Sequence, residues 1–198
     1  MSIQDLKNKY TWPSFTPEVS KRYKPSGVPD GWCAKPNIEM FKRLINKDTK
    51  VIVDAGSWLG LSAWHFLKLA PNATVICLDT WLGSEEHKDR KIIPILYETF
   101  IKNMWEYKDR IIPVREDSRI GFAEIAISDT QPDLIYIDMA HDRDSVIRDI
   151  CNAIRFFPRS KICGDDFTWQ GVKEALDFLT KERSMNFKTY ETCWELIN

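Results

Sequence analysis

Short apolar runs alternate with amphipathic stretches along most of the chain. Five runs have the length and composition of buried strands, at residues 51–55, 74–79, 111–114, 134–138 and 161–164. Before, between and after these runs, apolar residues recur at helical spacing within residues 37–45, 61–69, 92–107, 120–127, 146–157 and 172–179. Strands that alternate with helices are typical of a parallel sheet covered on both faces, and the stretch 187–198 predicts a closing hairpin.

Residues 1–36 break this pattern. Proline and aromatic residues are dense here: Pro13, Pro17, Pro25, Pro29 and Pro36, with Tyr10, Trp12, Phe15, Tyr23 and Trp32. Proline at this density disfavours long helices and central strands, whereas the aromatic side chains favour burial. We therefore expect an irregular N-terminal arm, residues 1–36, that lies as a cap over the site of a main domain spanning residues 37–198. A disordered tail is the alternative.

Composition narrows the class of protein. The chain has 198 residues, of which 43% are hydrophobic, and this suits a single domain with a sizeable core. The formal net charge of −1 argues against a protein that coats nucleic acid through a basic surface. The sequence leaves the oligomeric state open, a homodimer included.

The cysteines and the N-terminal sequence indicate the cellular compartment that we expect for the protein. The five cysteines lack C-x-x-C spacing, so a zinc finger or redox pair has no support, and we expect buried free thiols in a reducing compartment. The N-terminus lacks the apolar stretch of a signal peptide, and no run approaches the ~20 apolar residues of a membrane helix. We therefore expect a soluble cytoplasmic protein.

Ligands of open α/β sheets bind beyond the carboxyl ends of the strands, so the residues that follow each strand are informative. The first run leads into Asp54-Ala55-Gly56-Ser57-Trp58-Leu59-Gly60-Leu61-Ser62. Its two glycines permit a tight turn and a close backbone approach to a ligand, with helical N–H groups directed at it. The spacing matches neither G-x-G-x-x-G nor a phosphate-binding P-loop. A glycine turn without a ligand is the alternative.

The second and third strands also end on acidic residues. Asp79-Thr80-Trp81 follows the second run, where a carboxylate can accept both hydroxyls of a ribose and a tryptophan can stack on a purine. Asp117 and Ser118 follow the third run, and Asp117 has the chemistry to accept from an adenine amino group. For both aspartates, an ordinary helix cap is the alternative interpretation.

Acidic residues gather at the ends of the fourth and fifth strands. Asp138 ends the fourth, and Asp165 and Asp166 end the fifth, so adjacent strand ends would bring the three carboxylates together. Such oxygen ligands suit Mg²⁺ or Mn²⁺. His141, three residues beyond Asp138, is placed to act as a general base beside that cation. In the alternative, the acids are solvated or cap helices, and His141 caps the helix that begins near Arg143.

Together these segments resemble the class I S-adenosylmethionine-dependent methyltransferases, and more narrowly the metal-dependent O-methyltransferases of the macrocin and catechol type. The resemblance rests on the order and spacing of VIVDAGSWLGLSAW, VICLDTW, DLIYIDMAHD and KICGDDFTW, and it covers roughly residues 50–197. It implies a Rossmann-like α/β fold with a mostly parallel seven-stranded sheet, a C-terminal antiparallel hairpin and helices on both faces.

The resemblance also implies roles for single residues. Asp54, Gly56 and Ser62 would hold the methionine end of the cofactor, Asp79 its ribose and Asp117 its adenine. The whole cofactor-binding set would be Asp54, Gly56, Ser57, Trp58, Gly60, Ser62, Asp79, Thr80, Trp81, Asp117, Ser118 and Asp138. Asp138, Asp165 and Asp166 would hold the cation. His141, with Asp138, would be catalytic, and it falls where macrocin-type sugar enzymes place a histidine and catechol-type enzymes a lysine.

The expected activity is methyl transfer to a hydroxyl of a sugar or glycan, assisted by a divalent metal. Three alternatives stay open: a catechol-type small-molecule O-methyltransferase, an inactive protein that binds the cofactor, and a nicotinamide-dependent oxidoreductase. The last is disfavoured because the third glycine of the dinucleotide spacing is missing. Residues 1–36 align with no family segment, so the acceptor is the least determined part.

Overall fold

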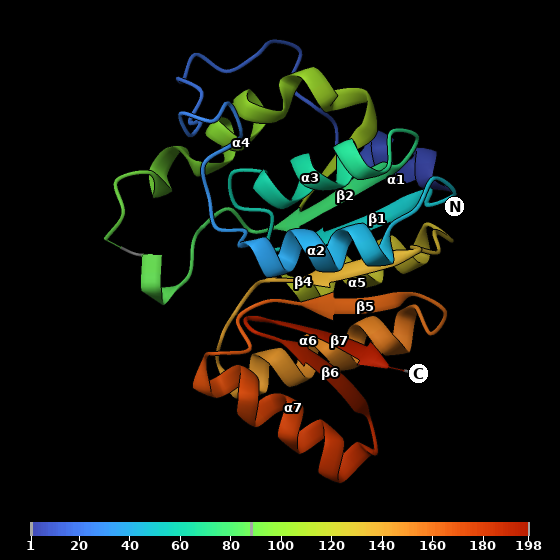
Figure 1. Ribbon diagram of the computed structural model, residues 1–198. Helices are drawn as coiled ribbons and strands as arrows, with labels where there is room; N and C mark the ends of the chain where they lie inside the picture. Colours follow the sequence, from blue (N-terminus) through green and yellow to red (C-terminus); the bar gives the residue numbers. More distant parts are fainter. Residues whose placement is uncertain (1, 88, 198) are drawn as a thin grey trace.

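The computed structural model describes residues 2–87 and 89–197, which fold around one seven-stranded sheet (Figure 1). Its strands are β1 (Val51–Ala55), β2 (Thr74–Asp79), β3 (Ile111–Arg115), β4 (Leu134–Ile137), β5 (Lys161–Gly164), β6 (Asn186–Tyr190) and β7 (Cys193–Ile197). Their order is β3-β2-β1-β4-β5-β7-β6; β1 to β5 pair in parallel, whereas β7 runs antiparallel to both β5 and β6. The Rossmann-like α/β fold expected from the sequence is confirmed.

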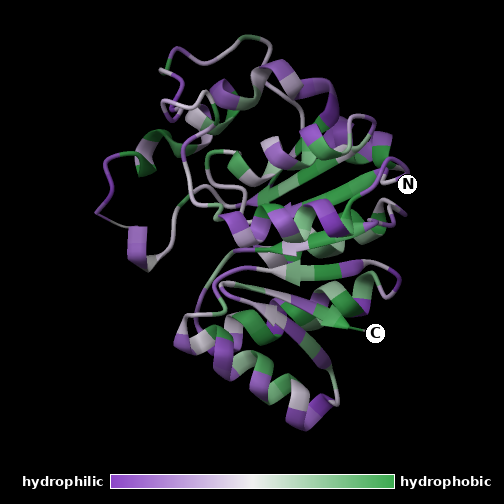
Figure 2. Ribbon diagram, in the orientation of Figure 1, coloured by the Kyte–Doolittle hydropathy of each residue, from purple (hydrophilic) through white to green (hydrophobic). Residues whose placement is uncertain are grey.

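Helices cover both faces of the sheet, because strand side chains point alternately to opposite sides. One core contains Ile52, Cys77 and Tyr136, and it packs under α2 (Lys35–Leu44), α3 (Leu61–Leu69) and α4 (Leu96–Met104). The other contains Val53 and Ile135 and packs under the remaining helices: α1 (Ile3–Lys9), α5 (Ser118–Ile127), α6 (Arg143–Phe156) and α7 (Gln170–Arg183). The central strands are almost wholly hydrophobic, and the helices are amphipathic (Figure 2).

Short 3₁₀ segments complete the chain: η1 (Glu85–His87), η2 (Ile93–Ile95) and η3 (Trp105–Arg110). The single helix predicted over 92–107 is therefore a 3₁₀ turn, a helix and a second 3₁₀ turn, and Pro94 lies in the first of these. The helix predicted from Asn37 begins at Lys35 instead, with Pro36 in its first turn, where proline is tolerated. None of the described helices combines the length and the apolar character required to cross a bilayer.

The chain order reverses between β1 and β4, and the carboxyl ends of the strands open there into a crevice. Gly56 adopts φ +99° just after β1, and a Cβ atom at this position would collide with the backbone carbonyl of Asp138. The glycine is therefore required because the exits of β1 and β4 touch. The two strand ends are locked by the Asp138 N–H, which donates to the Ala55 carbonyl at 2.8 Å.

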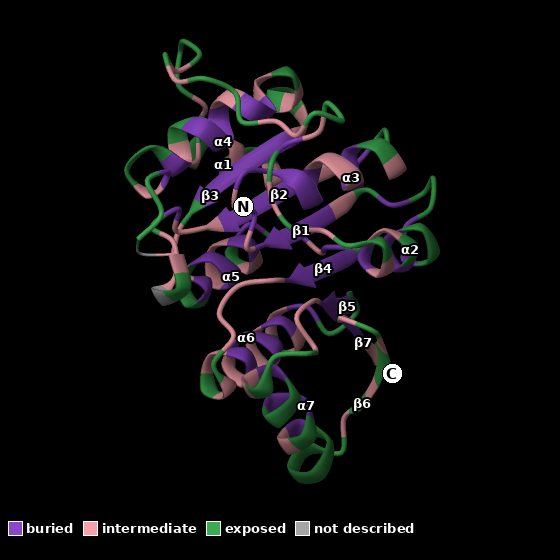
Figure 3. Cartoon of the chain, turned by 60° about the vertical axis from the view of Figure 1, so that its left-hand side comes forward, coloured by how far each residue is buried: buried purple, intermediate pink, exposed green. Residues whose placement is uncertain are grey.

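The N-terminal arm is less irregular than its prolines suggested. It begins with α1, which lies in the proline-free part of the arm and packs beside α5. The indole N–H of Trp12 then donates to the Ile111 carbonyl at 3.0 Å, which fixes the arm along β3. Residues 30–32 of the arm reach the carboxyl edge of the sheet. Burial is deepest in the sheet, and much of the rest of the arm is exposed (Figure 3).

Candidate active site

A cavity of about 700 Å³ opens at the carboxyl edge of the sheet. Loops after β1 to β5, the turn at 84–87 and residues 30–32 of the arm form its walls. Of the residues predicted for the site, those that line the cavity are Gly56, Ser57, Trp58, Ser62, Asp79, Thr80, Asp117, Ser118, Asp138, His141, Asp165 and Asp166. The structure thus brings twelve predicted residues to one cavity and leaves Asp54, Gly60 and Trp81 outside its lining.

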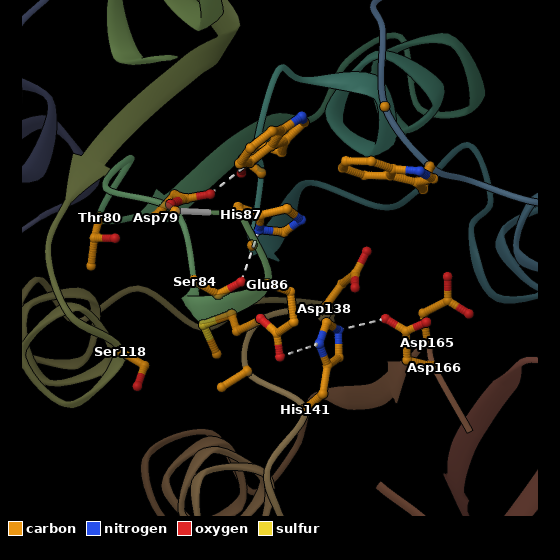
Figure 4. A pocket seen from close by; sticks show the side chains of 18 of the residues that line it. Asp79, Thr80, Ser84, Glu86, His87, Ser118, Asp138, His141, Asp165 and Asp166 are labelled. Carbon is orange, nitrogen blue, oxygen red and sulfur yellow. Dashed lines mark hydrogen bonds and ion pairs between the residues drawn. The ribbon is translucent and has the colours of Figure 1, made fainter. Parts of the chain in front are cut away.

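Asp79 organises the floor of this cavity. Its two carboxylate oxygens accept the backbone N–H groups of Trp58 at 2.8 Å and Trp81 at 2.7 Å, so one side chain holds the loops after β1 and β2 together (Figure 4). Burial raises the pKa of Asp79, and the backbone donors counteract part of that effect. Asp79 therefore joins two loops, whereas the alternative interpretation had it cap a helix. Each of its oxygens keeps a lone pair for a ligand hydroxyl.

The structure overturns the expectation that Trp81 stacks on a purine. Its side chain is only 1% exposed and packs against Tyr97 and Phe100, with ring centroids 5.0 and 4.6 Å away. The indole N–H donates to the Trp58 carbonyl at 2.8 Å. An indole ring is large enough to extend the core, and here it supports the glycine loop from below.

Asp54 lies directly beneath the glycine loop and is fully buried. The hydroxyl of Ser62 donates to its Oδ2 atom at 2.9 Å, whereas Oδ1 has no hydrogen-bond partner among the described residues. Burial raises the pKa of Asp54 to about 7. A buried acceptor without a donor costs free energy, so this atom marks a place that a donor would fill.

Asp117 both caps a helix and lines the cavity. It caps α5 by accepting the backbone N–H of Arg119 at 3.0 Å, as the structural alternative predicted, and it also lines the cavity. The hydroxyl of its neighbour Ser118 donates to Asp149 at 2.7 Å, which fixes the start of α5 against α6. The cap therefore does not exclude a ligand contact.

At the opposite end of the cavity, Asp138, His141 and Asp166 converge (Figure 4). One potential ligand atom from each lies within 4.8 Å of the others, and His141 Nε2 is 2.7 Å from Asp166 Oδ2. Burial, together with the charges of Asp165 and Asp166, raises the pKa of Asp138 well above its usual range. The hydrogen bond to Asp166 outweighs desolvation and raises the pKa of His141. The cluster is thus electrostatically suited to hold protons or a cation.

A buried polar network supports this cluster from behind. The amide of Asn37 donates to the Tyr136 hydroxyl at 3.0 Å, and that hydroxyl donates to Asp138 at 3.4 Å. Asp165 lies next to them; burial raises its pKa, and its Oδ1 atom has no hydrogen-bond partner among the described residues. Asn37 also closes the start of α2, because its side-chain oxygen accepts the Ala34 N–H at 3.1 Å.

His141 is enclosed on three sides. Besides Asp166, Glu86 Oε1 lies 3.6 Å from its Nδ1 atom, and the Trp169 ring stacks on the imidazole with centroids 4.5 Å apart. The residue that caps α6 is Asp142, whose side chain accepts the Ser145 N–H at 3.0 Å. The alternative in which His141 merely caps this helix is therefore wrong.

The cavity wall also contains residues that were not predicted as site residues, among them Trp32, Glu86, His87 and Trp169. His87 lies in a charged stretch that looks solvated in the sequence, yet its ring stacks on Trp32 and packs at a tilt against Trp58, with centroids 5.5 and 4.6 Å away. The presence of Trp81 and His87 close to the end of β2 is the signal that was available. It does not reveal which distant ring each one meets.

Comparison with known proteins places this geometry in a family. A family model described as a methyltransferase domain matches residues 53–167. No curated protein matches the chain in sequence. The region matched by the model contains both the glycine loop and the acidic cluster.

Solved structures share the fold at low identity. An O-methyltransferase from Bacillus cereus in complex with S-adenosylhomocysteine is 16% identical, with 87% of this chain and 86% of that chain covered and a TM-score of 0.57. A TDP-rhamnose 3'-O-methyltransferase of calicheamicin biosynthesis is 15% identical, with coverages of 80% and 76% and a TM-score of 0.56. The fibrillarin–Nop5p complex is 15% identical, with coverages of 91% and 90% and a TM-score of 0.59. At these identities the likeness shows the fold alone.

Proposed function

This chain belongs to the methyltransferase-domain family, and from that premise we propose that it transfers a methyl group from S-adenosylmethionine to a hydroxyl group of a sugar or glycan. One observation carries the proposal. A single cavity holds the loop organised by Asp79 at one end and the His141–Asp166 pair beside Asp138 at the other. Such a cavity can bind a cofactor and an acceptor next to each other.

The residues present fit the cofactor. The unpartnered Oδ1 atom of Asp54 suits the ammonium group of its methionine end, and Asp79 keeps lone pairs for the ribose hydroxyls. Asp117 and Ser118 line the cavity where the adenine would lie. When bound, S-adenosylmethionine supplies a methyl group activated by its positive sulfonium.

The acidic cluster fits a divalent cation. Its carboxylates raise one another's pKa values, and a cation would relieve their repulsion in place of protons. We propose Asp138, Asp165 and Asp166 as the oxygen ligands for Mg²⁺ or Mn²⁺. The potential ligand atoms that lie within 4.8 Å of one another come from Asp138, Asp166 and His141, so these three form the compact part of the site and Asp165 is its outer member. When bound, the cation lowers the pKa of the acceptor hydroxyl.

In the proposed reaction, the side chain of His141 removes the proton of the acceptor hydroxyl. The carboxylate of Asp166 lies 2.7 Å from Nε2 and would stabilise the imidazolium that forms when the ring takes this proton. The oxygen then forms its bond to the methyl carbon as the carbon–sulfur bond breaks, and S-adenosylhomocysteine leaves. Asp79 and the glycine loop hold the donor in line with the acceptor, and this alignment is the main contribution of the protein.

Aromatic side chains of the cavity wall suit a sugar acceptor. Trp32, Trp58 and Trp169 line the cavity, and the flat faces of such rings pack well against the C–H surface of a sugar. The sugar O-methyltransferase among the similar structures fits the same assignment. A catechol-type acceptor is the second candidate, because these rings would also stack on a flat phenol.

A methyl-transfer assay with labelled S-adenosylmethionine tests the proposal. We expect label in sugars or glycans from a panel that also contains catechols, and we expect its transfer to depend on His141. Label in catechols alone would favour the second candidate. Calorimetry adds two further outcomes: binding of S-adenosylhomocysteine without transfer would indicate an inactive binding protein, and binding of NAD in its place would indicate an oxidoreductase.

A further inference from the structure

A second hollow of about 490 Å³ adjoins the main cavity. The two share a wall made by Asp30, Gly31, Trp32, Trp58 and Arg90. We call this second hollow the annex. It lies between the arm, the glycine loop and the segment that follows η1, and the Trp32 ring stands at the boundary between the two spaces.

The annex and the main cavity have opposite charge. Three cationic side chains, Arg22, Arg90 and Lys91, line the annex together with one carboxylate, that of Asp30. The main cavity is lined by an excess of acids, and the chain as a whole has a formal net charge of −1. Three cations around one hollow are thus a local concentration that the overall composition does not explain.

The annex is built on a buried anchor. The side chain of Asn103 is fully buried; its Oδ1 atom accepts the Arg22 N–H at 2.9 Å, and its Nδ2 atom donates to the Arg22 carbonyl at 3.2 Å. Nδ2 also donates to the Leu59 carbonyl in the glycine loop at 3.0 Å. One amide therefore fixes the backbone of a cationic residue of the arm beside the loop that would hold the cofactor.

Trp32 links the annex to the acceptor end of the main cavity. It stacks on His87, and the guanidinium carbon of Arg90 lies 4.7 Å from the centre of its ring. Trp32 is still 54% exposed, so part of the indole is open to a ligand. A ligand that passes over Trp32 would have one end among cations and the other near His141.

We propose that the annex binds a phosphate group of the acceptor, so that the substrate is a phosphorylated sugar. Arginine and lysine are the side chains that bind phosphate in proteins, and the acids of the main cavity would repel the same group. The charges therefore allow one orientation, in which the phosphate lies in the annex, the sugar ring lies over Trp32 and a hydroxyl reaches His141. This inference rests on the proposed function of the main cavity. A sugar phosphate and a nucleoside diphosphate sugar share this chemistry.

Calorimetry on the protein saturated with S-adenosylhomocysteine tests the inference, with pyrophosphate, glucose 1-phosphate, UDP and glucose as probes. We expect the phosphorylated probes to bind more tightly than glucose. The double variant Arg22→Gln/Arg90→Gln should weaken their binding at least tenfold, and both side chains are exposed, so the fold should persist. The matched control is Lys50→Gln/Arg159→Gln, which removes the same charge at the amino ends of β1 and β5 and should change binding less than twofold.

Tighter binding of UDP than of glucose 1-phosphate would support the site and identify a nucleoside diphosphate sugar, and the reverse order would identify a sugar phosphate. The inference fails if the wild type binds no phosphorylated probe more tightly than glucose, or if both double variants lose binding equally. Failure of the proposed function is distinguishable. If the protein binds no S-adenosylhomocysteine, the proposed function is contradicted. Phosphate binding that depends on Arg22 and Arg90 would still support the anion site in that case.

Discussion

The Nε2 atom of His141 lies 2.7 Å from the Oδ2 atom of Asp166, although the two residues follow different strands. At this distance the carboxylate charge favours the protonated form of the imidazole. A potential ligand atom of Asp138 lies within 4.8 Å of both, so the pair is also part of the acidic cluster. The contact therefore joins two proposed roles, that of His141 as the general base and that of Asp166 as a cation ligand.

The pH dependence of turnover should report on this pair. The hydrogen bond to Asp166 is the largest influence that raises the pKa of His141, and the nearby Glu86 charge adds to it. A raised pKa means that the neutral base forms only at higher pH. Glu86→Gln should therefore move the acidic limb of the rate profile to lower pH, whereas Glu39→Gln, in an exposed pair with Lys35, should leave it in place. An unmoved limb in Glu86→Gln would show that His141 does not limit the rate.

Cofactor affinity should depend on Asp79. Asp79→Ala removes the carboxylate that would accept the ribose hydroxyls and that also holds the N–H groups of Trp58 and Trp81. Charge-assisted hydrogen bonds are worth roughly 1.5–3 kcal/mol each, so binding of S-adenosylhomocysteine should weaken at least tenfold in calorimetry. Affinity equal to that of the wild type would contradict the proposal that Asp79 binds the ribose of the cofactor. Far-ultraviolet circular dichroism checks that the variant is folded.

Asp54 should make the protein less stable as the pH rises. Its pKa is raised by burial to about 7 in the folded protein, so the folded state binds this proton more tightly than the unfolded state does. The contribution is complete below the ordinary pKa of aspartate and is lost as the pH rises through about 7, with a size of roughly 4 kcal/mol.

Asp54→Asn should therefore flatten part of the decline in unfolding free energy between pH 4 and pH 8, measured by urea denaturation. The variant should also bind S-adenosylhomocysteine more weakly, because the atom assigned to the ammonium group becomes neutral. An identical slope in wild type and variant would show that Asp54 is not titrating in this range.

Removal of the cation should abolish turnover. EDTA should stop methyl transfer, and Mg²⁺ or Mn²⁺ should restore it. Asp166→Asn should weaken Mn²⁺ binding at least tenfold, and Asp144→Asn, on the exposed start of α6, serves as the control. Full turnover in EDTA would show that the acids act without a cation. If Mn²⁺ binding is also lost in His141→Ala, the histidine is a ligand rather than the base.

The fold could be predicted because each strand and helix is indicated by residues that lie close together in the sequence. Buried parallel strands are continuous apolar runs, helices have their own spacing, and β2 and β5 lie where the pattern placed them. The helix α1 was missed because the prolines from residue 13 onward dominated the interpretation of the whole arm. Its own seven residues contain no proline.

The site could be predicted only as far as strand ends define it. Asp79, Asp138 and Asp166 come together because the carboxyl ends of neighbouring parallel strands share one edge of the sheet. The stacking of His87 on Trp32 and the burial of Trp81 depend on loop paths, and loops follow no repeating pattern in the sequence.

The most direct test of the account is a measurement of kcat and of S-adenosylhomocysteine affinity on the same sample of His141→Ala. A positioned general base is worth roughly 10²–10⁴ in rate, so kcat should fall by that factor. Cofactor affinity should change less than twofold, because His141 lies at the acceptor end of the cavity. A variant that keeps most of its turnover would contradict the account, and so would one that loses cofactor binding to the same extent as turnover.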